Sequence, residues 1–122
     1  MARTILGEVG GRPYSPGTQN GNLVFVSGQL GRDSSGKLVS GGVEAETEQT
    51  LENVKAVLAK AGASLDHVMM VNIYLIDWDR DYAAMNQVYS KYFGSSPPAR
   101  ATVEVSKLAL GATVEISAIA TL

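Results

Sequence analysis

The amino-acid sequence predicts an α+β protein in which two helices cover one face of a mixed β-sheet. Two stretches place apolar residues at helical spacing and end near a glycine, while four others are rich in strand formers or alternate polar with apolar residues. Their order along the chain is strand, helix, strand, helix, strand, strand. With 122 residues and 45% hydrophobic content the chain can build one core, so we expect a single domain over residues 1–122.

The first two predicted elements are a strand and a long amphipathic helix. Residues 23–28 are β-branched and aromatic and end in glycine, which is typical of a strand. A polar cluster at 33–36 predicts a turn, and the sequence leaves open a short edge strand over 37–39. Residues 43–61 have apolar side chains at helical spacing and acidic residues in the first turns, and Gly62 is placed to cap the end.

The second half of the chain predicts a strand, a helix and two further strands. Residues 67–76 are rich in strand formers and too short for a membrane-spanning helix. Asp77 or Asp79 can then cap a helix that ends at Gly94, and its tyrosines share a face that we interpret as packing. The two final strands are expected over 101–106 and 112–121.

Alternation in the last two strands predicts which residues lie under the helices. The apolar set is expected to pack there: Ala101, Val103, Val105, Val114, Ile116 and Ala118. The other set is expected on the opposite face: Arg100, Thr102, Glu104, Glu115, Ser117 and Ile119. That face also receives apolar residues from strands 23–28 and 67–76, more than a small monomer usually exposes. We therefore expect self-association over it, with sites between subunits.

Composition excludes several classes of function. The formal net charge is −2 and the basic residues are scattered, which argues against nucleic-acid binding. Cysteine is absent, which excludes a disulfide framework, thiolate catalysis and thiolate-bound metal. The first eight residues lack the apolar run of a signal peptide, and no stretch is long enough to span a membrane. We therefore expect a cytosolic protein.

One arginine stands out in the segment 97–105. Pro97 and Pro98 stiffen the approach to it, because the residue before each proline is pushed toward extended geometry. Arg100 therefore emerges from a defined turn, and a positioned guanidinium suggests recognition of a carboxylate or phosphate. The structural alternative is an ion pair with Glu104 or with a neighbouring chain.

Five segments carry a resemblance to a known family. They are Arg12-Pro13-Tyr14-Ser15, Phe25-Val26-Ser27-Gly28-Gln29, Leu51-Glu52-Asn53-Val54-Lys55-Ala56-Val57-Leu58, Asn86 with Val88-Tyr89 and Tyr92-Phe93, and Pro98-Ala99-Arg100 followed by Val103-Glu104-Val105. In these segments, and over essentially its whole length, the chain resembles the RidA/YjgF family of enamine/imine deaminases. The resemblance implies a chorismate-mutase-like α+β fold, a homotrimer with ligand clefts at the subunit interfaces, and neither a metal nor an organic cofactor.

The resemblance also implies a chemistry for these residues. Arg100 would hold the carboxylate of 2-aminoacrylate and related enamines, which tautomerise to imines and are hydrolysed to a 2-keto acid and ammonia. Tyr14, Ser27 and Asn86 match cleft positions. From the residues alone each keeps a structural alternative: an interface aromatic, a serine that satisfies backbone groups, and an amide that caps or bridges subunits.

Two departures from the family pattern bear on activity. Typical members end in Ile-Glu-Ile-Glu-Ala-Ile-Ala, whose second glutamate orders the attacking water. Ser117 stands in that place here, and without a base a serine is a poor proton acceptor. Glu115 lies on the same face, about 7 Å along the strand; Glu115 and Glu104 are either acid/base groups or interface ion-pair partners. Arg12 replaces the glycine before Pro-Tyr-Ser and adds positive charge at the cleft mouth.

Two functions remain open at this stage. The first is a hydrolase of small imino acids, with Arg100 on the carboxylate and a water aligned by Ser117. The second is a non-catalytic protein that binds 2-keto or amino acids, or a chaperone-like one. Ribonuclease action, also linked to the family, finds no histidine pair or basic groove here. Position 117 discriminates between the first two, because Ser117→Glu should raise imine hydrolysis if the serine leaves the cleft inactive.

Overall fold

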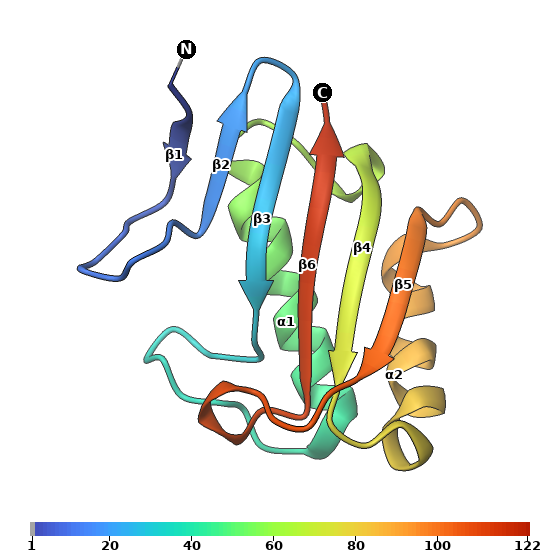
Figure 1. Cartoon of the computed structure of the whole chain (residues 1–122). Coiled ribbons are helices and arrows are strands. Elements are labelled where there is room, and N and C mark those ends of the chain that lie inside the picture. Colours follow the sequence, from blue (N-terminus) through green and yellow to red (C-terminus); the bar gives the residue numbers. More distant parts are fainter. Residues whose placement is uncertain (1) are drawn as a thin grey trace.

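The computed structural model describes residues 2–122, which form six strands and two helices (Figure 1). In chain order they are β1 (Thr4–Leu6), β2 (Gly17–Asn20), β3 (Leu23–Gln29), α1 (Gly42–Ala59), β4 (Val68–Leu75), α2 (Trp78–Phe93), β5 (Ala99–Glu104) and β6 (Val114–Thr121). Single 3-10 turns, η1 (Leu65–His67) and η2 (Ala109–Gly111), precede β4 and β6.

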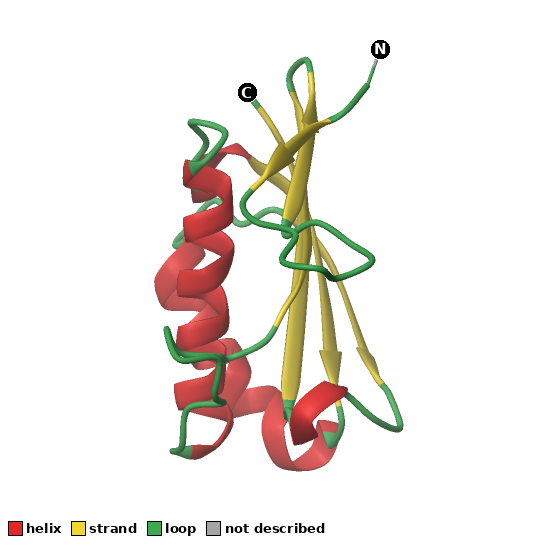
Figure 2. Ribbon diagram, turned by 90° about the vertical axis from the view of Figure 1, so that its left-hand side faces the viewer, coloured by secondary structure: helices red, strands yellow, loops and turns green. Residues whose placement is uncertain are grey.

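The strands form one mixed sheet in the order β1-β2-β3-β6-β4-β5. β4 and β5 are parallel, and the other neighbouring pairs are antiparallel. A parallel pair needs a long crossover connection, and α2 supplies it. Figure 2 shows both helices in one layer against one face of the sheet, with the opposite face uncovered. The predicted class, two helices on one face of a mixed sheet, is confirmed.

The sequence pattern does not predict the two short strands at the N-terminal edge. β1 has three residues, and β2 is Gly-Thr-Gln-Asn, a largely polar run that no hydrophobic alternation marks. Pairing with neighbours holds them, since Thr18 of β2 lies between Ile5 of β1 and Phe25 of β3. In contrast, residues 37–39 form no strand, and only a single bridge joins Arg32 to Leu38. Strand formation at a sheet edge depends on the available partner more than on intrinsic propensity.

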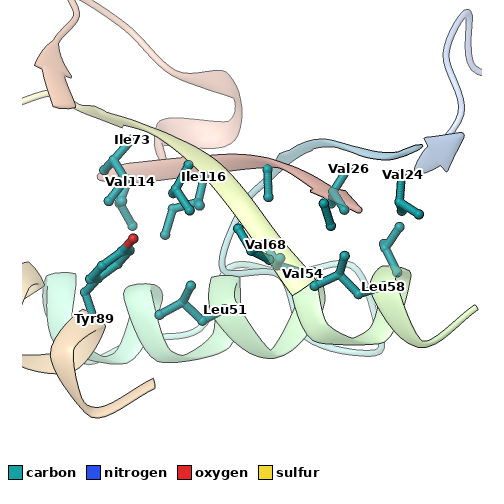
Figure 3. Packing of buried hydrophobic residues seen from close by; sticks show 14 of the residues in the cluster. Val24, Val26, Leu51, Val54, Leu58, Val68, Ile73, Tyr89, Val114 and Ile116 are labelled. Carbon is teal, nitrogen blue, oxygen red and sulfur yellow. The ribbon is translucent and has the colours of Figure 1, made fainter. Parts of the chain in front are cut away.

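The core lies between the helices and the covered face of the sheet (Figure 3). α1 contributes Leu51, Val54 and Leu58, spaced three and four residues apart on one face of the helix. They meet alternate residues of the strands, such as Ile73 and Ile116, which are fully buried. Complete burial of one such side chain stabilises the fold by about 1.5–3 kcal/mol, so this layer fixes both helices over the sheet.

Two carboxylates secure the start of α2. Asp77 is the N-cap, and its Oδ1 accepts a hydrogen bond from the backbone N–H of Arg80 at 3.1 Å. Glu104, at the end of β5, accepts a second bond through Oε1 from the backbone N–H of Trp78 at 2.8 Å. Carboxylates satisfy free N–H groups and complement the positive helix terminus. They therefore fix α2 against β5, the strand that carries Arg100.

The predicted facing of β5 is wrong. Arg100 pairs with Val71 of β4 and Thr102 with Ile73, and both β4 residues are fully buried under the helices. Side chains of paired residues point to the same face of a sheet. Arg100, Thr102 and Glu104 thus lie on the helix side, while Ala101 and Val103 face away, with Val103 46% exposed. The reason is that α2 offers this edge strand polar partners, so apolarity does not mark its covered face.

The facing of β6 is as predicted. Val114, Ile116 and Ala118 are buried beneath the helices, and Glu115, Ser117 and Ile119 point to the uncovered face. That face also exposes large apolar side chains of β3 and β5: Leu23 at 49%, Phe25 at 42% and Val103 at 46%. We call this surface the open face. Its apolar character agrees with the sequence prediction.

Candidate functional site

Arg100 is held by aromatic side chains of α2. Its Nη2 donates a hydrogen bond to the hydroxyl of Tyr82 at 3.1 Å, and the guanidinium carbon lies 4.7 Å from the centre of the Tyr89 ring. Arginine stacks well on aromatic faces and keeps its in-plane N–H groups free when it does so. Within residues 2–122 no carboxylate pairs with this guanidinium, and Glu104 is engaged by Trp78 instead. The intrachain ion pair is therefore not formed.

A pocket of about 360 Å³ opens beside the guanidinium. We call it the arginine pocket; it is lined by Asn86, Tyr89, Ser90, Phe93, Gly94, Pro97, Pro98 and Arg100. Two of its lining residues have a buried polar atom without a hydrogen-bond partner in the described chain: Oδ1 of Asn86 and the hydroxyl oxygen of Tyr89. Unpartnered buried polar atoms are costly, and at a pocket they indicate where a ligand or water bonds.

The pKa values of the two tyrosines beside Arg100 are shifted in opposite directions. The neighbouring amide of Asn86 lowers the pKa of the Tyr82 hydroxyl, and the Arg100 charge adds to that effect. Burial raises the pKa of Tyr89 despite the same arginine. The Tyr89 hydroxyl therefore stays protonated at neutral pH and can donate or accept a hydrogen bond.

A second pocket, of about 380 Å³, contains the other group of predicted residues. We call it the glutamate pocket. Its lining comes from the segment before β2, the end of β3 with the loop after it, α1, η2 and β6: Arg12, Tyr14, Pro16, Gly28, Gln29, Leu30, Arg32, Asp33, Ser34, Gly36, Asn53, Ala109 and Glu115. The polar side chains there can donate to an anion through the arginines and accept a proton through the glutamate.

Glu115 is packed across the backbone of Gly28. A Cβ added at Gly28 would overlap the Glu115 carboxylate, so the carboxylate can keep this position only beside a glycine. Burial raises the pKa of this carboxyl. No ion pair within residues 2–122 involves Glu115. A half-buried carboxyl with a raised pKa, unpaired and facing a pocket, is suited to exchange a proton with a water molecule.

Arg100 and Glu115, one from each pocket, lie on opposite faces of the sheet. Arg100 shares the covered face with Val71, whereas Glu115 pairs with Tyr74 and lies on the open face. The predicted residues divide accordingly: Asn86 lies with Arg100, and Tyr14 lies with Glu115. A single chain does not bring Arg100 and Glu115 together.

Three predicted residues line neither pocket: Ser27, Ser117 and Glu104, whose carboxylate accepts the Trp78 N–H. The Ser27 hydroxyl donates to the carbonyl oxygen of Ser15 at 2.6 Å and thereby ties the segment before β2 to β3. Ser117 pairs with Asn72 in the middle of the open face. Ser27 thus has the structural contact that the sequence left open as its alternative.

Sequence reasoning missed the support of Arg100. The aromatic stripe predicts packing alone for Tyr82 and Tyr89, and Tyr89 is indeed buried in the core (Figure 3). The signal was available: Tyr82, Asn86 and Tyr89 are spaced at i, i+4 and i+7, which places all three on one face of a helix. An amide within an aromatic stripe indicates a face that also meets a polar group.

The part of the chain that the structure describes has neither a cluster of metal ligands nor a membrane-spanning helix. No group of three or more histidine, aspartate or glutamate side chains is arranged to hold a metal ion. Between residues 2 and 122, no helix has the length and apolar character needed to cross a membrane.

The fold and pockets define an α+β protein with an unpaired, aromatic-supported arginine at the edge of a mixed sheet. Comparison with known proteins identifies its family. The family described as Endoribonuclease L-PSP matches residues 9–122. The chain therefore belongs to this family, whose solved members include proteins named RidA and YjgF.

Individual relatives cover most of the chain. A RutC family protein of Pyrococcus abyssi is 48% identical over 109 residues, which are 88% of this chain and 85% of that protein. The mouse protein named 2-iminobutanoate/2-iminopropanoate deaminase is 42% identical over 109 residues, 88% of this chain and 80% of its own length. The structure of RidA from an Antarctic Psychrobacter has a TM-score of 0.87 at 39% identity and covers 97% of this chain and 94% of that one.

Proposed function

We propose that this protein is an imine deaminase that hydrolyses small 2-imino acids, and the enamines that tautomerise to them, to 2-oxo acids and ammonia. The observation that carries the proposal is the state of Arg100. Its guanidinium is fixed on Tyr89 and Tyr82, has no carboxylate partner in the described chain, and faces a pocket. A bidentate arginine–carboxylate pair gives both affinity and orientation. Relatives named as imine deaminases support the same assignment.

The complete site in this proposal forms between copies of the chain in a homotrimer. Arg100 and Glu115 lie on opposite faces of one sheet, so the arginine pocket of one copy must meet the glutamate pocket of another. The open face supports this assembly, because it exposes Leu23, Phe25 and Val103. Apolar side chains gathered on one face are typical of surfaces that associate.

In the proposed mechanism Arg100 binds the carboxylate of the imine and thereby places its C=N carbon beside Glu115 of the neighbouring copy. Glu115 takes a proton from a water whose oxygen attacks that carbon. It returns the proton to the imine nitrogen, which gives a tetrahedral carbinolamine. The carbinolamine O–H proton then passes through the same carboxyl to the amine, the C–N bond breaks, and ammonia leaves as the carbonyl forms. A carboxyl with a raised pKa can act in both directions.

Glu115, rather than Ser117, has the water-activating role in this proposal. Glu115 lines the pocket and its carboxyl is half-buried, whereas Ser117 lines neither pocket. A hydroxyl without a base beside it cannot accept the proton. The serine at position 117 therefore does not prevent turnover, and Ser117→Glu is expected to bring no gain in rate.

A ribonuclease function, which the family description names, has no comparable support in the residues of the two pockets. The only histidine of the sequence, His67, lines neither pocket, and its Nδ1 accepts a hydrogen bond from the backbone N–H of Ser64 at 3.0 Å. General acid–base cleavage of RNA commonly uses groups that titrate near neutral pH, and histidine is the usual one.

The deciding experiment separates turnover from binding. An amino-acid oxidase generates 2-iminopropionate from alanine, and semicarbazide traps the imine that the protein has not yet hydrolysed. Wild type is expected to compete with the trap. The Arg100→Ala and Glu115→Gln variants are expected to lose at least about 100-fold in kcat/KM. The Arg100→Lys variant is expected to have an intermediate kcat/KM. Should wild type and Arg100→Ala leave the trapping rate equally unchanged while pyruvate still binds, the protein is the non-catalytic binder instead.

A further inference from the structure

We propose that the glutamate pocket contains a second anion subsite, formed by Arg12 and Arg32, which selects imino acids with a second carboxylate. The inference rests on the proposed function and names its substrate class: four- or five-carbon 2-imino dicarboxylates and the 2-oxo dicarboxylates derived from them. Both arginines line the same pocket as Glu115.

Arg12 is held in place without any acidic partner. Its Nε donates to the carbonyl oxygen of Val9 at 3.1 Å and its Nη2 to that of Glu8 at 3.0 Å. The guanidinium carbon lies 5.7 Å from the centre of the Tyr14 ring, which lines the same pocket. These contacts use one edge of the guanidinium. They leave Nη1, with two N–H groups, without a bond to any group in the described chain.

Arg32 provides the second guanidinium, and the backbone of this residue is held by two contacts. The Asn53 side chain donates to the Arg32 carbonyl oxygen at 2.9 Å, and the bridge to Leu38 closes the loop. Neither arginine takes part in an ion pair within residues 2–122. Two arginines at one pocket without carboxylate partners provide forked donors for an incoming carboxylate.

The acidic groups of the pocket leave these donors free. Oδ1 of Asp33 accepts three hydrogen bonds inside its own turn, from the backbone N–H groups of Ser35 and Lys37 and from the Ser35 hydroxyl, at 2.9, 3.1 and 2.6 Å. The Ser35 hydroxyl is the largest cause of the lowered pKa of Asp33, so that charge is stabilised by its turn. Glu115 is the other acid, and burial disfavours its charged form. Neither neutralises the arginines directly.

The size of the pocket fits a short second arm on the substrate. Its volume of about 380 Å³ lies in the range that holds small ligands. With one carboxylate on Arg100 of the neighbouring copy and the reacting carbon at Glu115, the distal carboxylate of a four- or five-carbon acid is proposed to bond to Arg12 and Arg32, which line the same pocket. A monocarboxylate such as 2-iminopropionate has no group to bond to these two arginines.

The test compares two substrates in wild type, Arg12→Ala, Arg32→Ala and the double variant. 2-Iminopropionate and 2-iminoglutarate are generated in place from alanine and glutamate by the matching oxidases. In the double variant kcat/KM is expected to fall about 10- to 100-fold for the dicarboxylate, and by less than about threefold for the monocarboxylate. Arg3→Ala, which removes an arginine outside both pockets, is expected to leave both values unchanged.

A binding measurement keeps this inference separate from the proposed function. 2-Oxoglutarate and pyruvate are titrated into the same proteins by calorimetry. If no imine is hydrolysed but 2-oxoglutarate binds more tightly than pyruvate and loses that advantage in the double variant, the proposed function fails and the subsite stands. If imines are hydrolysed with no preference, and the double variant changes neither binding nor kcat/KM, the subsite is overturned and the deaminase stands.

Discussion

The guanidinium of Arg100 lies 4.7 Å from the centre of the Tyr89 ring, and that ring is itself part of the core between helices and sheet. The residue proposed to bind substrate thus rests on a buried aromatic. Tyr89 therefore contributes both to the packing of the core and to the placement of the Arg100 charge. Its individual groups can be tested only by substitutions that remove as few atoms as possible.

Tyr89→Phe provides such a substitution. The Tyr89 hydroxyl is buried without a hydrogen-bond partner in the described chain, so its removal is expected to leave the free energy of unfolding unchanged or to raise it by up to about 1 kcal/mol. Tyr89→Leu removes the aromatic face as well and is expected to cost about 2–4 kcal/mol. Urea unfolding measures both. A loss above about 1 kcal/mol in Tyr89→Phe would show that the hydroxyl has a partner in solution.

Gly28→Ala tests the placement of Glu115. The added Cβ overlaps the Glu115 carboxylate, so the carboxylate must move, and kcat is expected to fall at least about 10-fold. The same change in a Glu115→Gln background is expected to add little, because the group that it displaces has already lost its function. Steady-state kinetics of the four proteins form a double-mutant cycle. Additive losses would contradict the contact.

Glu115 also predicts a pH dependence of stability. Burial raises its pKa in the folded chain above the ordinary value of 4.5, so in that range the folded state binds more protons than the unfolded one. The free energy of unfolding should therefore fall as the pH rises from about 4.5 through the raised pKa. Subtracting the urea-unfolding curve of Glu115→Gln isolates this carboxyl. A difference that grows with pH would mean that the carboxylate is stabilised rather than desolvated.

Glu104→Ala is expected to destabilise the start of α2. It removes the acceptor of the Trp78 N–H and should lower the free energy of unfolding by about 1 kcal/mol. Glu104→Gln keeps an oxygen acceptor and should lose less. Chemical denaturation of both variants measures the effect, and imine hydrolysis by Glu104→Gln is expected to stay near wild type. A loss of turnover in Glu104→Gln at unchanged stability would point instead to acid–base chemistry at this residue.

Complementation tests the division of the site between copies. Arg100→Ala and Glu115→Gln are each expected to be inactive, but an equal mixture that is unfolded and reassembled should regain about a quarter of wild-type activity. The reason is statistical, because one interface in four then joins an intact Arg100 to an intact Glu115. A control mixture of Arg100→Ala with the Arg100→Ala/Glu115→Gln double variant should regain none. Equal inactivity of both mixtures would contradict a shared site.

The sequence identifies the covered elements far better than the edges of the sheet. Helices α1 and α2 and strand β6 follow from periodicity, because buried residues dominate their patterns. The prediction of which β5 residues face the helices is wrong for a physical reason. The helix-side residues of β5 contact Tyr82 and the start of α2, while Val103 points to the open face. β1 and β2 have no pattern of their own, because pairing alone makes them strands.

In the candidate site, too, some features can be predicted from the sequence and others depend on packing. Arg100 is identifiable from its proline-stiffened turn, but its support by Tyr82 and Tyr89 depends on how α2 crosses β5. The proposed role of Glu115 in place of Ser117 also depends on packing, since two residues on one face of a strand differ only in what lies beside them. The Glu115 carboxylate lies across Gly28, and that proximity arises where β3 shifts register against β6.

The placement of Arg100 and Glu115 on opposite faces has a consequence for how the protein behaves in dilute solution. A chain that contributes half of one site and half of another has no complete site when alone. In the proposed assembly, specific activity is therefore not a constant of the protein but rises with its concentration through the association equilibrium. Dilution would dissociate the assembly and abolish activity without unfolding the chain. The rate of catalysis would then rise more steeply than in direct proportion to the concentration of the chain.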